Sequence, residues 1–147
     1  MLASSIAIAA PPAKFLQEAI QGDNSETRLG QLIATRGATL AVRNFGSTLV
    51  HDHTRARAQA AGVARQMHVS VPGAMMPEAR EEYAKLQGLH ARAFDREVRR
   101  YMIDDHRKDI SDFQEQARGR DRRTTAMAQA QLPTLRKHLR MAESLPR

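Results

Sequence analysis

Two short stretches of the sequence each contain an Asp-His pair: VHDHTRA at residues 50–56 and IDDHRKD at residues 103–109. In each stretch a histidine, His53 or His106, falls where helical spacing calls for an apolar core residue. Imidazole and carboxyl groups in a helical core must be hydrogen-bonded, paired or bound to a cation. The polar residues of the core are therefore the candidates for the chemistry of this protein.

Every long amphipathic pattern in the sequence carries such a residue on its apolar stripe. These residues are Glu26 in the first pattern, His53 in the second, Asp95 and His106 in the third, and His138 in the fourth. At about 1.5 Å of rise per residue, Glu26, His53 and His106 share a middle level of a helical bundle. The same counting puts His138 closer to Asp95, which is about 16 Å from His106 along its helix. One site and two separate polar layers both stay open.

A divalent metal ion is one explanation for these side chains. Two or three imidazoles with one carboxylate are typical zinc ligands, and iron or manganese also accepts such a set. Asp52 and Asp105 precede the two histidines and point in other directions, so they are candidates for supporting the ligands or for the surface. The alternative is a metal-free bundle in which buried Glu-His and Asp-His pairs fix the helix register.

The elements that position these residues are expected to be helices. The periodicity predicts helices at residues 13–36, 38–67, 78–87, 89–117 and 121–145. Within the first helix, GDNSE (residues 22–26) has low helix propensity and predicts a bend or a break. A connection rich in helix breakers separates the second helix from the short third one. The pattern predicts an all-α, ferritin-like four-helix bundle with a long crossover that contains a short extra helix, in one domain over residues 12–147.

Composition excludes several classes of protein. The 147 residues include no Cys, so disulfides, thiolate zinc sites and Cys nucleophiles are excluded. The net charge of +7 is dispersed among acidic residues, which argues against nucleic acid as a partner. No stretch approaches the roughly 20 apolar residues of a membrane span. Residues 1–11 look like the second half of a secretory signal without its positive region, so a leader and a disordered N-terminus both stay open.

Four segments of the chain resemble successive motifs of the DUF4142 family. They are FLQEAIQGDNSETRLGQLIATRG, LVHDHTRA, AFDREVRRYMIDDHRKDISDF and LPTLRKHLRMAESL, and the resemblance covers about residues 15–145. It implies a ferritin-like bundle from a bacterial protein that usually carries an export signal, and hence a periplasmic or envelope location in preference to the cytoplasm. The family's characteristic polar positions correspond to Glu26, Asp52, His53, Asp95, Asp105, His106 and His138. The family has no settled biochemical activity.

The sequence therefore predicts an exported, non-enzymatic helical bundle that binds a divalent metal ion, with zinc favoured, in metal handling or envelope stress. No Glu or Asp precedes a His by three residues. The Glu-x-x-His pairs of di-iron bundles are thus missing, and ferroxidase chemistry is not expected. An enzyme built on the same ligands, a homodimer and a protein partner stay open.

Overall fold

The structure is a computed structural model that describes residues 9–147, and within this range the chain forms five α-helices. They are α1 (Pro12–Arg36), α2 (Leu40–Gln66), α3 (Pro77–Gln87), α4 (Ala91–Gln116) and α5 (Arg122–Ser144). The all-α prediction is confirmed, and the helix bounds differ from the expected ones by at most two residues. Most of the leader-like stretch, residues 1–8, lies outside the described residues. None of the helices in the described range is long and apolar enough to cross a membrane.

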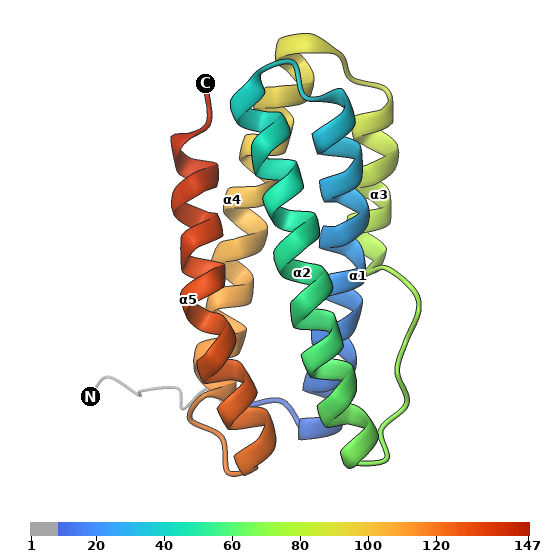
Figure 1. The fold of residues 1–147 in the computed structure, drawn as a ribbon, viewed down its shortest axis with the longest axis vertical. Coiled ribbons are helices and arrows are strands. Elements are labelled where there is room, and N and C mark those ends of the chain that lie inside the picture. Colours follow the sequence, from blue (N-terminus) through green and yellow to red (C-terminus); the bar gives the residue numbers. More distant parts are fainter. Residues whose placement is uncertain (1–8) are drawn as a thin grey trace, which may run out of the picture.

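Two helical hairpins lie side by side, as Figure 1 shows. α1 and α2 form one antiparallel pair, α4 and α5 form the other, and α2 packs against α5. Between the hairpins, the chain returns along the molecule through an extended loop and α3. As a result, α2 and α4 run in the same direction, and α3 packs against both α1 and α4.

Local sequence signals set the ends of the helices. Pro12 and Pro77 stand in the first turns of α1 and α3, where a backbone N–H has no intrahelical partner to lose. Thr39 caps α2 and Asp121 caps α5, each accepting a hydrogen bond from a backbone N–H of the first turn. These signals are local, which is why the pattern predicted the bounds closely.

The GDNSE segment does not break α1, since α1 is one continuous helix from Pro12 to Arg36. Asn24 donates to two carbonyl groups of the crossover loop, each at 3.0 Å. The Ser25 hydroxyl accepts the backbone N–H of Met76 at 2.9 Å, just before α3. These tertiary hydrogen bonds offset the low helix propensity of the segment, and they hold the crossover against α1.

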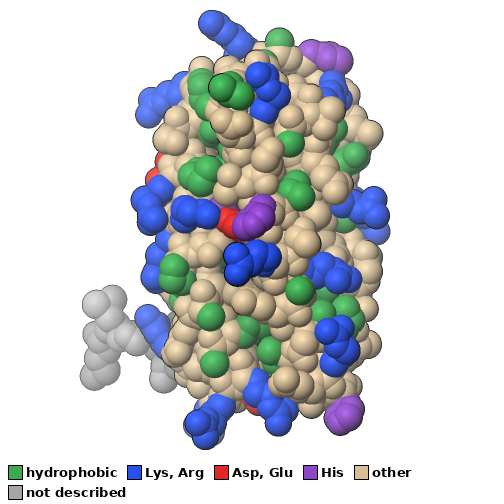
Figure 2. All heavy atoms as spheres, viewed as in Figure 1, with side chains coloured by type: hydrophobic (Ala, Val, Ile, Leu, Met, Phe, Trp, Pro, Cys, Tyr) green, Lys and Arg blue, Asp and Glu red, His purple; other side chains and the backbone are tan. Residues whose placement is uncertain are grey.

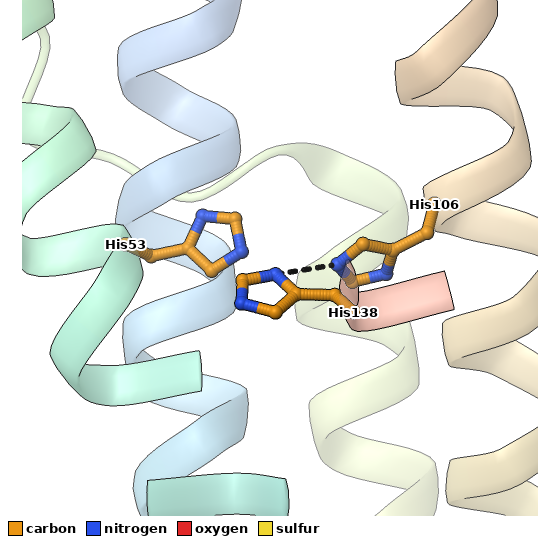
Figure 3. Close-up of side chains that lie close together, drawn as sticks. All are labelled: His53, His106 and His138. Atoms are coloured by element: carbon orange, nitrogen blue, oxygen red, sulfur yellow. Dashed lines mark hydrogen bonds between the residues drawn. The ribbon is translucent and has the colours of Figure 1, made fainter. Parts of the chain in front are cut away.

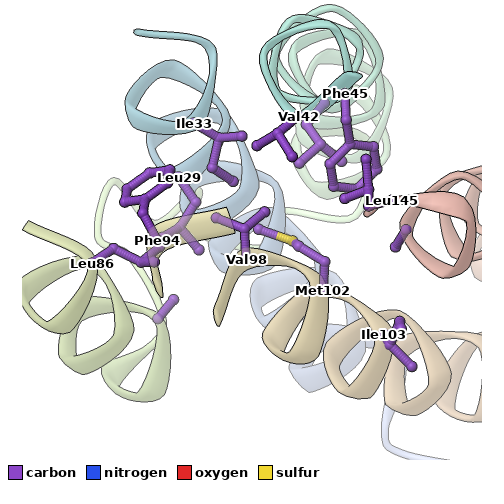
Figure 4. Close-up of a cluster of buried hydrophobic side chains, with 13 residues drawn as sticks. Leu29, Ile33, Val42, Phe45, Leu86, Phe94, Val98, Met102, Ile103 and Leu145 are labelled. Atoms are coloured by element: carbon purple, nitrogen blue, oxygen red, sulfur yellow. The ribbon is translucent and has the colours of Figure 1, made fainter. Parts of the chain in front are cut away.

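Buried apolar side chains fill the two ends of the bundle and leave an interval between them. The cluster near the α1–α2 turn, drawn in Figure 4, includes Leu29, Leu49 and Phe94. The cluster near the α4–α5 turn includes Ile20 and Ala60. On the four long helices, the interval between the two clusters holds the buried polar residues Asp23, Ser25, Glu26, His53, His106 and His138.

Candidate metal centre

Three histidines from three helices meet in the interval between the apolar clusters (Figure 3). His53 comes from α2, His106 from α4 and His138 from α5, and the centroids of their rings are 5.1 to 6.0 Å apart. All three side chains are buried, with at most 4% of any residue exposed. The closest nitrogens, His106 Nε2 and His138 Nδ1, are 3.3 Å apart. The structure thus brings together three histidines, although the rise per residue had placed His138 at a different level from His53 and His106.

His138 lies beside His106 and not near Asp95, where helix counting placed it. α4 and α5 are antiparallel, and side chains lean toward the N-terminus of their own helix. His106 therefore leans toward the α3–α4 turn, while His138 leans toward the α4–α5 turn. The two side chains therefore lean toward each other, and their rings lie closer along the helix axes than their Cα atoms do.

Asp95 does not join the histidines, although the sequence pattern included it among the candidate ligands. Its Oδ1 accepts the backbone N–H of Ala38 at 2.8 Å, and its Oδ2 accepts that of Thr39 at 3.0 Å. These amides stand at the start of α2, where N–H groups lack intrahelical partners and the helix dipole favours negative charge. Asp95 therefore caps α2 from α4, and both of its oxygens are engaged.

The outward-facing nitrogens of His106 and His138 both donate hydrogen bonds. His106 Nδ1 donates to the carbonyl oxygen of Met102 at 3.0 Å, and His138 Nε2 donates to Asp52 Oδ2 at 2.8 Å. A carbonyl and an ionised carboxylate only accept, so the ring protons lie on these outer nitrogens. His106 Nε2 and His138 Nδ1 consequently face each other as lone-pair donors.

Asp52 is held in its ionised form. Although partial burial opposes the change, hydrogen bonds from Lys137, His51 and His138 hold the pKa of Asp52 below its usual value. Lys137 Nζ lies 2.5 Å from Oδ2, and His51 Nδ1 lies 2.9 Å from Oδ1. Asp52 therefore orients one ring of the cluster while its own charge is compensated at the surface.

His53 presents its free nitrogen from the opposite side. Its Nδ1 donates to Asp23 Oδ1 at 2.9 Å, and its Nε2 lies 3.9 Å from Glu26 Oε2. Within the described chain, neither His53 Nε2 nor either carboxylate oxygen of Glu26 has a hydrogen-bond partner. Buried polar atoms without partners are uncommon in folded proteins. His53 and Glu26 each belong to a group of side chains that could hold a cation.

The rings of His106 and His138 are neutral at physiological pH. Burial, aided by the neighbouring His53 and His138 rings, lowers the pKa of His106 well below its usual value. Burial also lowers the pKa of His138, to about 4. Neutral imidazole is the form that binds metals, so both rings are in the state that coordination needs.

Carboxyl groups of Glu26 on α1 and Asp105 on α4 lie close together next to the histidines. Ligand atoms of Glu26, Asp105 and His106 all lie within 4.8 Å of one another. Burial, together with the charges of Asp105 and Asp109, raises the pKa of Glu26 well above its usual value. Burial likewise raises the pKa of Asp105 and, with the charge of Asp105, that of Asp109. Like charges at this spacing repel unless a proton or a cation lies among them.

Sequence reasoning missed Asp23 and Asp109. Each stands one helical turn from a residue that it did select, Asp23 three residues before Glu26 and Asp109 four residues after Asp105. Residues with this spacing share a helix face, and that is the signal that would have found them. The other three histidines, His51, His68 and His90, are exposed, as expected.

A cavity of about 840 Å³ reaches His53, Asp105 and Asp109 and is lined by residues from all five helices. Only 3 of the 23 Lys and Arg residues line it, but 9 of the 16 acidic residues do: Glu18, Asp23, Asp52, Glu78, Glu82, Asp104, Asp105, Asp109 and Asp112. On the face drawn in Figure 2, by contrast, Lys and Arg are scattered and acidic side chains are scarce. The cavity is thus a locally negative region in a chain of net charge +7.

The fold and this centre define an all-helical protein with imidazole and carboxyl groups gathered in its core. The whole of residues 2–145 matches the family described as a domain of unknown function, DUF4142. The chain belongs to this family, as the four motifs indicated. No curated protein and no solved structure matched it.

Proposed function

We propose that this protein binds a divalent metal ion through His53, His106 and His138, with Glu26 as a fourth ligand and zinc as the favoured ion. The observation that carries the proposal is the direction of the rings. Hydrogen bonds hold the outer nitrogen of every ring, so all three free nitrogens face the interior. Histidine ligands of metals are oriented in this way by acceptors behind them.

The distance between His106 Nε2 and His138 Nδ1 supports a shared metal ion over a hydrogen bond. Zinc–nitrogen bonds of about 2.0–2.1 Å in a tetrahedron separate the ligand atoms by about 3.3–3.4 Å. The two nitrogens are 3.3 Å apart. A hydrogen bond between them needs a proton on one, but Met102 and Asp52 already hold the ring protons on the far sides. Two facing lone pairs repel each other, and a cation between them removes that repulsion.

Glu26 supplies the negative charge of the proposed ligand set. It is 1% exposed, and its Oε2 lies 3.9 Å from His53 Nε2. Three imidazoles and one carboxylate make the mixed nitrogen and oxygen set on which zinc binds tetrahedrally, while iron and manganese tolerate the same atoms. Zinc is favoured because four donors are enough for it.

The proposal also covers the setting of the site, namely an exported, non-catalytic bundle of ferritin-like arrangement that acts in metal handling or envelope stress. The long crossover between α2 and α4 supports the ferritin-like arrangement. The leader-like start of the sequence supports export. The missing Glu-x-x-His pairs separate the protein from ferroxidases.

Metal analysis of protein purified without a His-tag tests the proposal. We expect bound zinc by mass spectrometry. Zinc returned to chelator-treated protein at 100 times its Kd should add about 2.7 kcal/mol to the free energy of unfolding and so raise the melting temperature. His106→Gln should weaken zinc binding at least 100-fold. His90→Gln is the matched control, because His90 is exposed at the start of α4 and should leave zinc binding unchanged.

The metal-free alternative makes the opposite prediction. If the polar pairs only fix the helix register, replacing His53 and His106 together by Leu should preserve or raise stability. The melting temperature of the original protein should then ignore zinc, iron and chelator alike. That pair of results would overturn the metal proposal.

A further inference from the structure

We propose that Glu26, Asp105 and Asp109 hold a second divalent cation next to the imidazole site, and that this position prefers an oxygen-binding ion such as Mn²⁺. The inference rests on the proposed function, because Glu26 belongs to both positions. It goes beyond that function by assigning two ions of different chemistry to one centre.

The carboxyl groups of Glu26 and Asp105 come together, and both oxygens of Glu26 are unsatisfied. Glu26 is 1% exposed and, in the described part of the chain, neither of its carboxylate oxygens has a hydrogen-bond partner. Ligand atoms of Glu26, Asp105 and His106 lie within 4.8 Å of one another, a spacing suited to donors around one ion. A fully buried carboxyl group with two free oxygens is stabilised either by a proton or by a cation bound to those oxygens.

A single ion cannot use all of these donors. His106 belongs both to the histidine group and to the group with Glu26 and Asp105. It has only one free nitrogen, because its Nδ1 donates to Met102. When that nitrogen binds an ion together with the other two histidines, the carboxylates need a further donor of their own.

Asp109 is that donor. It stands one turn after Asp105 on α4, so the two side chains share a helix face. The negative charge of Asp109 also helps to raise the pKa of Glu26. Asp105 and Asp109 also line the acidic cavity, which gives a cation a route of approach from solvent.

The donor atoms set the preference of each position. Imidazole nitrogens suit zinc, whereas carboxylate oxygens suit manganese, magnesium and calcium. Glu26 has one oxygen 3.9 Å from His53 Nε2, and its second oxygen is free for the carboxylate position. One carboxylate serving two neighbouring ions is an arrangement that two-metal centres use.

Sequential loading of the full chain tests the second position. Chelator-treated protein is given one equivalent of Zn²⁺, and Mn²⁺ is then titrated while free and bound Mn²⁺ are measured by electron paramagnetic resonance. We expect one further equivalent of Mn²⁺ to bind. The double variant Asp105→Asn with Asp109→Asn should lose at least 100-fold in Mn²⁺ affinity and keep its Zn²⁺. Asp112→Asn is the matched control, since Asp112 is one turn further along α4, half-exposed and paired with Lys108.

The outcomes separate the two proposals. Zinc binding without saturable Mn²⁺ binding, or equal Mn²⁺ binding by the double variant, overturns the second position and leaves the imidazole site standing. Failure to bind either ion overturns both. Neutral Asn side chains relieve the repulsion among the carboxylates, so the double variant should fold. If its circular dichroism shows otherwise, Asp109→Asn alone decides by the same titration.

Discussion

The three core histidines rely on different kinds of acceptor behind their rings. His106 uses a backbone carbonyl of its own helix, while His53 and His138 use carboxylates that come from other helices. Such acceptors fix both the ring orientation and the nitrogen that carries the proton, and their loss typically weakens metal binding 10- to 100-fold. Asp23 and Asp52 are therefore part of the candidate centre without facing its middle.

Asp95 illustrates a buried carboxylate with a purely structural task. Asp95→Asn leaves only one acceptor oxygen for the amides of Ala38 and Thr39 and removes the charge that favours the start of α2. We expect a loss of about 1–3 kcal/mol in the free energy of unfolding, measured with urea. Zinc affinity should stay the same. A large loss of zinc with unchanged stability would return Asp95 to the ligand set.

At the scale of the elements, α1 and α2 touch through their backbones. A Cβ on Gly30 would lie 2.9 Å from the carbonyl oxygen of Gly46, and a Cβ on Gly46 would lie 2.7 Å from that of Gly30. Ordinary side chains do not fit at such distances, so glycine allows the close approach. This crossing holds α1 and α2 at the separation that lets Asp23 reach His53.

Two glycines of α2 should respond in opposite ways to the same substitution. Gly46→Ala forces α1 and α2 apart and should cost about 2–4 kcal/mol of stability. Gly62→Ala meets no atom within 4 Å in the described chain and should stabilise the protein by about 0.5–1 kcal/mol, because Ala is the better helix former. Urea unfolding of both variants measures the difference. Equal effects would contradict the close crossing.

At the scale of the whole molecule, charge is divided between the cavity and the rest of the surface. The cavity is lined by most of the acidic residues, while the chain as a whole is basic. A negative concavity raises the local concentration of cations even when the net charge of the protein is positive. The same concentration of carboxyl groups also makes the stability of the molecule depend on pH.

Glu82 on α3 contributes to this pH dependence in a way that can be measured. Burial and the charge of Glu97 raise the pKa of Glu82 to about 7, from an ordinary value of 4.5. Between these two pH values the folded chain keeps a proton that the unfolded chain has lost, so stability falls as pH rises and levels off above about pH 7. Glu82→Gln should match the original protein at pH 4 and exceed it by about 1–2 kcal/mol at pH 8.

Urea unfolding at the two pH values measures this effect. Glu81→Gln is the control, because Glu81 is an exposed neighbour on α3. Its effect should be small and equal at both pH values. An equal effect of Glu82→Gln at pH 4 and pH 8 would show that the pKa of Glu82 is the same in the folded and the unfolded chain.

The sequence by itself determined which segments are helical and which polar residues stand on their apolar faces. Both follow from local properties, namely capping residues, helix breakers and the 3.6-residue period. Glu26, His53, His106 and His138 could therefore be selected from the periodicity alone. The family could be recognised for a similar reason, since its motifs are read along the chain.

Only the tertiary structure decided which of these residues meet. The sequence placed His138 near Asp95, whereas the structure places it against His106 and turns Asp95 toward the start of α2. The structure also adds Asp23 and Asp109 to the residues of the candidate centre, although the periodicity had not distinguished them from solvated residues. The reason is that rotation, lean and separation of packed helices depend on contacts between distant segments. They shift a side chain by a few ångströms, and such a shift decides whether a carboxylate meets a backbone amide, an imidazole or water.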